Sequence, residues 1–400
     1  MSTPAVIYDP LREAQEFREK LGSDKRRLAF LFGAGTSQAV GLEGIAGLTL
    51  KISAHLTSAQ REQYERFLRE LGAGTTVEHV LDIVRLCREL VRSGGQHDVR
   101  GLRGNESAEL DRAICQAIFK EVSVDPPRGL LPHLRFAGWV RSVSREHPIE
   151  VFTTNYDLLI ERGLEAAETP HFDGFVGTVE PYFSSISVEA EPARATEAVY
   201  PPRSWVRVWK LHGSIGWRVQ TDSATKATRI IRTPRQAPQA GDDLMIFPTR
   251  EKYSDSRKLP FVAYHDRLRR LLSSGETLLV VAGYSFGDEH LNEIVFEGLR
   301  NNTRLAVVVV LYEPLAKAER LLSRAPGLRN LLIYGPDSAC LGGVSGKWST
   351  SLKTPPESMG SWPFWAESDK RFILGDFSAL TNFLELFVGG GRTVDASGAQ

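Results

Sequence analysis

The chain has 400 residues, of which 42% are hydrophobic and 24% are charged, as in an ordinary soluble globular protein. Its 49 basic residues balance 49 acidic ones, so net charge provides no general attraction to nucleic acids or membranes. Apolar runs are too short to cross a bilayer, and the amino terminus lacks the pattern of a signal peptide. The scattered cysteines include no Cys-x-x-Cys pair, which argues against disulfides and a cysteine-built zinc site. We expect a cytoplasmic protein without a metal and without a nucleic-acid or membrane partner.

The first expected strand ends in a glycine-rich turn. Residues 1–25 contain one expected helix, and the strand Arg27–Phe32 then leads into Gly33, Ala34, Gly35, Thr36 and Ser37. Glycines after a strand allow a close approach to a ligand, and free N–H groups at a helix start favour phosphate. A plain strand-to-helix turn would have the same pattern. The usual dinucleotide fingerprint is incomplete, because Gln38 replaces its third glycine, so a hydride-transfer Rossmann enzyme is not favoured.

Residues 50–146 have the pattern of a helical module inserted into an α/β core. Apolar residues recur there at three- and four-residue spacing, the period of helices that bury one face. The expected helices are Gln60–Leu71, Thr76–Arg92, Glu106–Val122 and Leu131–Val143. Thr75 and Glu78 have the spacing of a capping box at the start of the second helix.

The stretch from Ile149 to Ile160 begins as a short buried strand and continues as a helix. Between the two lie Thr154, Asn155 and Asp157. Open α/β sheets bind ligands at the carboxyl ends of their strands, which makes these residues candidates for a site. The alternative is that Thr154 or Asn155 only caps the helix that follows.

A histidine follows the next clear strand. Residues 168–260 are expected to contain loops and β extensions, among them a hairpin extension over Val219–Ile246. Within them, the alternating strand Trp205–Leu211 ends at His212-Gly213. Histidine titrates near neutral pH and therefore suits proton transfer at such a position. A structural, hydrogen-bonded histidine is the alternative.

A further strand, Thr277–Ala282, leads into a second glycine-containing turn. Its continuous apolar character is typical of a parallel strand that is covered on both faces. The turn contains Gly283, Tyr284, Ser285 and Asp288, and the expected helix after it carries His290. We interpret it as a phosphate- or ribose-binding turn, or else as an ordinary turn in which Asp288 caps the helix.

The rest of the chain is expected to complete the sheet and cover it. Residues 331–400 should form a strand (Leu331–Tyr334), a surface loop (Gly335–Met359), an amphipathic helix (Asp376–Phe387) and a flexible tail (Gly389–Gln400). The repeated order of strand and helix predicts an α/β fold, a Rossmann-like parallel sheet with helices on both faces. Carboxyl ends of parallel strands lie at one edge, so the polar turns should converge on one cleft.

These turns have a family resemblance. Thr154-Asn155-Tyr156-Asp157, Lys210-Leu211-His212-Gly213-Ser214 and Gly283-Tyr284-Ser285-Phe286-Gly287-Asp288 follow the glycine-rich turn in the order seen in sirtuins. The residues of these motifs resemble most closely those of the sirtuin-like proteins of bacterial antiphage defence. The resemblance implies a sirtuin-like NAD-binding domain over residues 26–330. Deacylating sirtuins also have two Cys-x-x-Cys pairs and a Gly-Ile-Pro-x-Phe-Arg loop, which this sequence lacks.

The resemblance implies hydrolysis of NAD⁺ to ADP-ribose and nicotinamide, with Asn155 orienting water and ribose and His212 as general base. It also implies an NAD-depleting effector that forms homo-oligomers or works with a partner such as a HerA-type ATPase. Deacylation or ADP-ribosyl transfer is one alternative, and a non-catalytic sensor of NAD⁺ or ADP-ribose is another. Asp157 either holds the ribose or caps its helix. The residues expected to contact the nucleotide are Gly33, Ala34, Gly35, Thr36, Ser37, Thr154, Asp157, Gly283, Tyr284, Ser285, Asp288 and His290.

Overall fold

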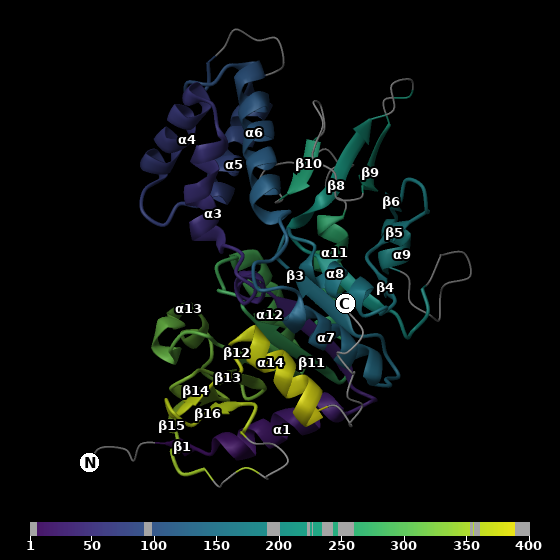
Figure 1. Ribbon diagram of the computed structural model, residues 1–400, viewed down its shortest axis with the longest axis vertical. Helices are drawn as coiled ribbons and strands as arrows, with labels where there is room; N and C mark the ends of the chain where they lie inside the picture. The colour runs from purple at the N-terminus through teal and green to yellow at the C-terminus, as the bar shows by residue number, and fades with distance from the viewer. Residues whose placement is uncertain are drawn as a thin grey trace.

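The computed structural model describes residues 6–91, 98–189, 201–221, 225, 227–233, 243–246, 260–352, 355 and 361–388. Its centre is a ten-stranded sheet with the order β1-β15-β14-β13-β12-β11-β2-β3-β7-β4 (Figure 1). The strands are β1 (Ile7–Tyr8), β2 (Arg27–Phe32), β3 (Glu150–Thr153), β4 (His171–Phe172), β7 (Val206–Lys210), β11 (Thr277–Ala282), β12 (Leu305–Val310), β13 (Leu331–Tyr334), β14 (Ser338–Leu341) and β15 (Val344–Trp348). Neighbouring strands from β13 to β4 are all parallel, while β14 is antiparallel to β13 and to β15. The predicted fold class is confirmed.

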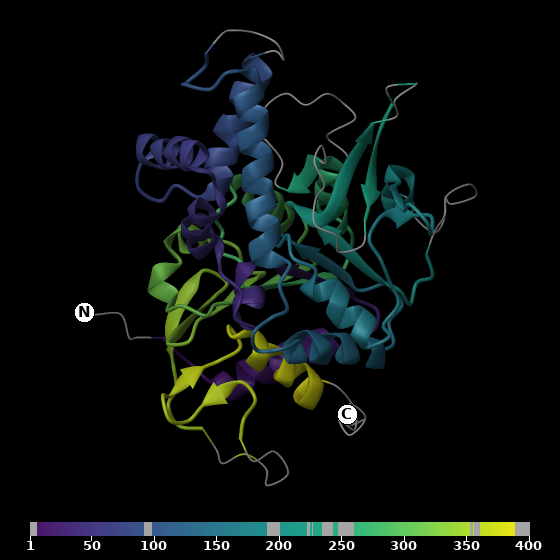
Figure 2. The ribbon, with the colours of Figure 1, turned by 45° about the horizontal axis from the view of Figure 1, so that its top comes forward.

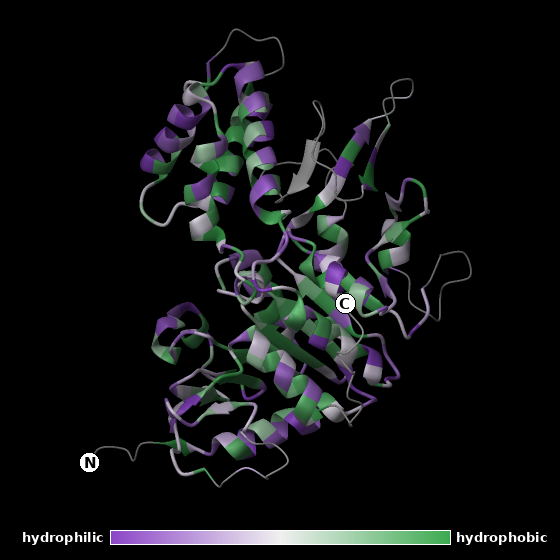
Figure 3. Ribbon diagram, viewed as in Figure 1, coloured by the Kyte–Doolittle hydropathy of each residue, from purple (hydrophilic) through white to green (hydrophobic). Residues whose placement is uncertain are grey.

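The central strands are apolar along their whole length because both of their faces are covered. Every residue of β11 is buried, and Figure 3 shows the centre of the sheet as hydrophobic. Side chains of a strand alternate between the two faces. Leu31 and Leu279 therefore belong to one hydrophobic core, whereas Phe30 and Val280 belong to the other.

Helices cover both faces. The first core is closed by α9 (Ser185–Glu189), α11 (Phe261–Leu272), α12 (Glu289–Asn301), the short η2 (Leu315–Lys317) and α13 (Glu319–Leu322). The second is closed by α1 (Pro10–Gly22), α7 (Leu131–Ser142), α8 (Leu159–Ala166), α14 (Phe377–Phe383) and the π-helical turn η4 (Leu384–Val388). Among the described helices none combines the length and the apolar character that a membrane span requires.

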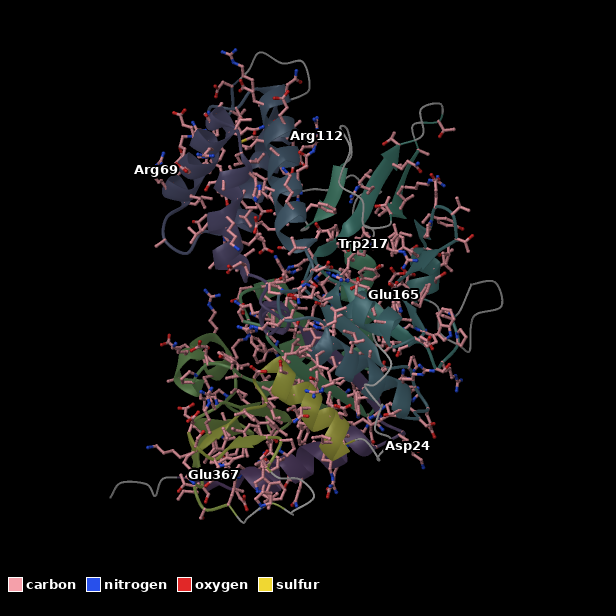
Figure 4. The ribbon with its side chains drawn as sticks, in the orientation of Figure 1. Asp24, Arg69, Arg112, Glu165, Trp217 and Glu367 are labelled. Carbon is pink, nitrogen blue, oxygen red and sulfur yellow. The ribbon has the colours of Figure 1, made fainter. Side chains whose placement is uncertain are left out.

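A separate group of helices lies beyond the carboxyl edge of the sheet, at the top of Figures 1 and 2. This helical module consists of α3 (Ile45–Ile52), η1 (Ser53–His55), α4 (Ser58–Leu71), α5 (Val77–Leu90) and α6 (Gly104–Val122). It has a hydrophobic core of its own, which also takes in Tyr156 and Ile215 from the α/β part. Figure 4 shows Arg69 and Arg112 on its outer helices.

The module differs in extent from the predicted residues 50–146. It begins earlier, at α3, and α7 packs on the sheet instead. The ring of Phe136 on α7 lies 5.1 Å from that of Phe30 on β2, edge to face. The amphipathic pattern of α7 shows that one face is buried, but it contains no information about the partner, which is why the pattern alone misplaced this helix.

A second sheet of five strands extends from the same edge, in the order β10-β8-β9-β6-β5. Its strands are β5 (Phe175–Val176), β6 (Tyr182–Phe183), β8 (Gly213–Thr221), β9 (Thr228–Arg232) and β10 (Asp243–Ile246). The expected hairpin is present where β8 pairs antiparallel with β9, and the residues 222–224, 226 and 234–242 of that region lie outside the described ones. Trp217, labelled near the centre of Figure 4, is buried against Phe175 and Tyr264.

The prediction of a loop over Gly335–Met359 was wrong for the first part of this range, where β14 and β15 form. These strands are short and bury only some of their residues, so their sequence lacks a clear alternation. Trp348 at the end of β15 stacks on Phe372, with ring centroids 4.8 Å apart. Phe372 belongs to a small hairpin of β16 (Trp365–Ala366) and β17 (Arg371–Phe372). The expected flexible tail, Gly389–Gln400, lies outside the described residues.

Candidate functional site

The ends of four neighbouring parallel strands are in register. Ala282 of β11 pairs with Phe32 of β2, Phe32 pairs with Thr153 of β3, and Thr153 pairs with Lys210 of β7. The turns at Gly33, Thr154 and Gly283 begin directly after one of these residues, and His212 lies two residues after Lys210. The prediction that the turns converge on one edge of the sheet is therefore confirmed.

A cavity of about 1380 Å³ lies at this edge, between the strand ends and the helical module. The predicted residues that line it are Ala34, Gly35, Ser37, Thr154, Asn155, Asp157, His212, Gly283, Tyr284, Ser285, Asp288 and His290. The other two predicted residues, Gly33 and Thr36, are buried and do not line the cavity. The helical module contributes Ile45, Ala46, Gly47, Leu48, Gly74, Thr76, Glu78, His79, Asp82 and Val122. Two arginines also line the cavity, Arg320 of α13 and Arg269 of α11, of which Arg269 pairs with Asp266 at 2.9 Å.

The two glycine-containing turns pack against each other. The N–H of Gly35 donates to the carbonyl of Gly283 at 2.9 Å. A Cβ on Gly33 would lie 2.5 Å from the oxygen of Gly283, and one on Gly35 would lie 2.6 Å from its Cα. Gly283 also has a φ of 65°, in the left-handed region that favours glycine. These glycines are needed for the close contact between the turns.

This contact corrects the expectation of free N–H groups for three residues of the first turn. The N–H groups of Gly33, Gly35 and Thr36 donate to the carbonyls of Ala282, Gly283 and Gly33, at 3.1, 2.9 and 3.0 Å. The short helix α2 (Ala34–Gln38) follows Gly33 at once. A turn that is held by a neighbouring strand end uses its amides internally, which a local sequence pattern cannot reveal.

Asn155 is held in place by this first turn. Its Nδ2 lies 3.1 Å from the carbonyl oxygen of Gly33, 3.0 Å from Thr36 Oγ1 and 3.0 Å from Ser37 Oγ. A carbonyl can only accept, so the amide nitrogen must face the turn. Within the described part of the chain, no donor is bonded to Asn155 Oδ1. Asn155 therefore has a fixed orientation and retains an acceptor at the cavity.

Asp157 connects the short helix α2 to the start of α8. Its Oδ2 accepts from Ser37 Oγ at 2.7 Å, and its Oδ1 accepts from the N–H of Leu159 at 3.0 Å. The buried Lys210 donates to the backbone carbonyl of Asp157 and pairs with Glu161 at 3.1 Å. Each carboxylate oxygen of Asp157 thus accepts one hydrogen bond, and the bond from Leu159 holds the first residue of α8 (Leu159–Ala166).

His212 is paired with a carboxylate. Its Nε2 lies 2.9 Å from Asp288 Oδ2, while Asp288 Oδ1 accepts from the N–H groups of His290 and Leu291 at 2.9 and 3.1 Å. Burial raises the pKa of the Asp288 carboxyl, but the hydrogen bond and charge of His212 outweigh burial and hold it well below its ordinary value. Asp288 thus caps α12, the alternative left open by its sequence position, and also orients the imidazole.

The turn that carries Asp288 has an unusual backbone. Phe286 has a φ of 55°, which is uncommon for any residue but glycine. Its ring contacts that of Tyr284 at 4.9 Å between centroids, and its carbonyl accepts from Asn292 Nδ2 at 3.0 Å. The hydroxyl of Tyr284 donates to Asn292 Oδ1 at 3.1 Å. The Asn292 side chain of α12 thereby fixes the turn that positions Asp288.

Sequence reasoning missed Glu78, which enters the site from the helical module. Its Oε1 lies 3.9 Å from His212 Nδ1 and accepts from the hydroxyl of Tyr156. Burial raises the pKa of the Glu78 carboxyl to about 7, with the charge of His212 opposing this shift and that of Asp288 adding to it. The predicted capping role was wrong, because Thr76 is the N-cap and His79 Nδ1 accepts from its N–H at 3.0 Å. Because the sequence pattern placed the cap one residue too early, Glu78 was assigned to the cap and was not considered as a site residue.

Comparisons with known proteins add a family likeness. No curated protein matches the chain. A solved Sir2 homologue in complex with NAD is 13% identical, covers 80% of this chain and 87% of that chain, and has a TM-score of 0.38. An ADP-ribose complex of a Sir2 homologue variant is 13% identical, covers 76% of this chain and 87% of that chain, and has a TM-score of 0.36. Residues 149–331 match the family model of the SIR2-like domain, and this segment carries Asn155, His212 and Asp288.

Proposed function

We propose that the chain hydrolyses NAD⁺ to ADP-ribose and nicotinamide. The observation that supports this most is the common cavity of Asn155 and His212, two residues beyond the paired Thr153 and Lys210, within a segment that matches the SIR2-like domain. A cavity of about 1380 Å³ is large enough for a dinucleotide, since sites for smaller ligands are roughly 300–1,000 Å³.

The reaction breaks the bond between C1′ of the ribose and the nicotinamide nitrogen. Nicotinamide leaves as a neutral molecule with the bonding electron pair, and the sugar passes through an oxocarbenium-like state. Asn155 Oδ1 would accept a hydrogen bond from a ribose hydroxyl and so fix the sugar in the cavity, a positioning role. The orientation imposed by Gly33, Thr36 and Ser37 supports this assignment.

Water then attacks C1′ and must lose a proton. The ionised Asp288 can only accept at His212 Nε2, which assigns the ring proton to Nε2 and leaves the Nδ1 lone pair as the base. General-base catalysis of this kind contributes roughly 10²–10⁴-fold to a rate. Arg269 and Arg320 would balance the charge of the diphosphate.

Release of nicotinamide from NAD⁺ alone tests the proposal, with the full chain, Asn155→Ala and His212→Ala compared. We expect release by the wild type and a loss of at least about 10²-fold in each variant. Deacylation and ADP-ribosyl transfer need an acceptor and would give little product from NAD⁺ alone. A sensing module would gain thermal stability with NAD⁺ and release no nicotinamide, and that result would overturn the proposal.

We further propose a biological setting from the resemblance of the motifs. The chain would be the NAD-depleting effector of a bacterial antiphage system, acting in the cytoplasm as a homo-oligomer or with a HerA-type ATPase. Cells that express the chain should lose NAD⁺ during phage infection, and cells that express Asn155→Ala should retain it. Equal NAD⁺ levels in both would contradict this setting.

A further inference from the structure

The helical module reaches into the reaction site through one side chain. Glu78 lies in the first turn of α5, lines the cavity and places Oε1 3.9 Å from His212 Nδ1. The side chain is 22% exposed, so it is accessible from the cavity while most of its surface is covered. His212 therefore stands between two carboxylates, Asp288 at Nε2 and Glu78 at Nδ1.

The position of Glu78 is built by contacts from both parts of the protein. The hydroxyl of Tyr156 donates to Glu78 Oε1, and the Tyr156 ring lies in the core of the helical module. Tyr156 directly follows Asn155, so a single turn orients the ribose-binding amide and the carboxylate. The cap is formed by Thr76 and His79, so the Glu78 side chain is not needed for the capping hydrogen bonds.

We propose that Glu78 completes the general base of the hydrolysis, an inference that rests on the proposed function. When water attacks C1′, the new C1′–O bond forms and the water proton moves to Nδ1 of His212. The resulting imidazolium is neutralised by the Glu78 carboxylate, which faces Nδ1, and the proton then leaves to solvent through the cavity. Glu78 acts through His212 and is a positioning and charge-balancing residue.

The electrostatic surroundings support this pairing. The charged groups around Glu78 are His212, Asp288 and Asp82, and burial raises the pKa of its carboxyl to about 7. His265 of α11 also faces His212, and burial lowers the pKa of its own imidazole. A carboxyl group whose pKa lies near neutral pH suits a role beside a proton-accepting imidazole at that pH.

The inference also gives the helical module a function. Glu78 approaches His212 only while α5 is docked at the sheet edge, where Tyr156 and Ile215 enter the core of the module. Displacing the module would remove the carboxylate from the imidazole, while the hydrogen bond between Asp288 and His212 lies outside the module. The docking of the module would thereby control the rate of hydrolysis.

The test measures nicotinamide release from NAD⁺ by the full chain between about pH 5.5 and about pH 9. Glu78→Gln should lower kcat by at least about tenfold and shift the acid limb of the profile to lower pH. Tyr156→Phe should act in the same direction, but more weakly. Glu89→Gln, an exposed glutamate on the same helix, is the matched control and should leave rate and profile unchanged.

Azide provides a readout that a merely structural role would not affect. Azide is already an anion and forms a C1′–N bond without giving up a proton. It should therefore restore nicotinamide release in Glu78→Ala and His212→Ala, but not in Asn155→Ala. Thermal unfolding identifies a variant that fails to fold.

The outcomes separate the two proposals. An active wild type whose Glu78→Gln variant keeps both rate and pH profile overturns the inference and leaves the proposed function intact. Failure of azide to restore a folded Glu78→Ala variant also overturns it. A wild type that releases no nicotinamide at any pH overturns the proposed function, and this inference with it.

Discussion

The imidazole of His212 is held by Asp288 at 2.9 Å, although β7 and α12 are separated in the chain by β8, β9, β10, α11 and β11. The same carboxylate caps α12 through its other oxygen. Helix capping and orientation of the ring are thus combined in one side chain. Substitutions at this position can separate the two effects.

Asp288→Asn should reduce nicotinamide release by about 10²-fold or more and leave the fold almost unchanged. Asparagine caps helices as well as aspartate does, but its amide can present a donor to Nε2 and favour the wrong tautomer. Asp288→Ala should also lose the cap, at a further cost of about 1 kcal/mol in the free energy of unfolding. Kinetics and urea unfolding of both variants test this, and equal unfolding midpoints would refute the capping role.

Gly283→Ala should destabilise the protein by roughly 2–4 kcal/mol, because two costs add. The new Cβ would lie 2.7 Å from the backbone nitrogen of Thr36, and the φ of 65° disfavours alanine. Gly287→Ala in the same turn is the control, since its Cβ would meet only Ser285 Oγ at 3.3 Å. Thermal unfolding compares them, and similar melting temperatures would show that the turns need not pack so closely.

Glu78→Gln should be more stable than the wild type at alkaline pH. The pKa of the Glu78 carboxyl is about 7 in the folded chain against an ordinary value of 4.5, so the folded state holds its proton longer. Stability is therefore lost as pH rises from about 4.5 through about 7, and glutamine removes this loss. The gain should be roughly 1–3 kcal/mol at about pH 8 and should disappear near pH ~4.5. A gain that does not change with pH would contradict the buried-carboxylate explanation.

His133→Phe should make the fold more resistant to acid. His133 on α7 is 1% exposed, and neither ring nitrogen has a hydrogen-bond partner among the described residues. Burial lowers its pKa to about 4, with the charge of Asp157 opposing the shift. The unfolded state binds the proton first, so stability falls as pH drops from about 6.5 to about 4.

Phenylalanine keeps the contact with Phe377, whose ring lies 5.1 Å from that of His133. Between about pH 7 and pH 4 the wild type should lose roughly 3 kcal/mol more than the variant. Urea unfolding at both pH values measures the difference. Parallel losses in the two proteins would mean that another group controls acid unfolding.

Much of the α/β frame could be predicted because its strands are continuous apolar runs. The predicted strands Arg27–Phe32, Thr277–Ala282 and Leu331–Tyr334 coincide with β2, β11 and β13. Continuous apolar runs of this kind have few stable alternatives to a strand covered on both faces. The half-buried strands β14 and β15 were not predicted, because their mixed burial gives neither an apolar run nor a clear alternation.

The sequence by itself determined which polar residues follow the central strands, and parallel pairing then brings those residues to one edge. Asn155 and His212 were therefore predicted as neighbours. Only the tertiary structure decided that Asp288 orients His212, that the glycines pack on each other and that Glu78 enters from the module. Such contacts form where segments that are distant in the sequence pack against each other. The packing energy comes from many residues in the hydrophobic cores, so no local sequence pattern reveals it.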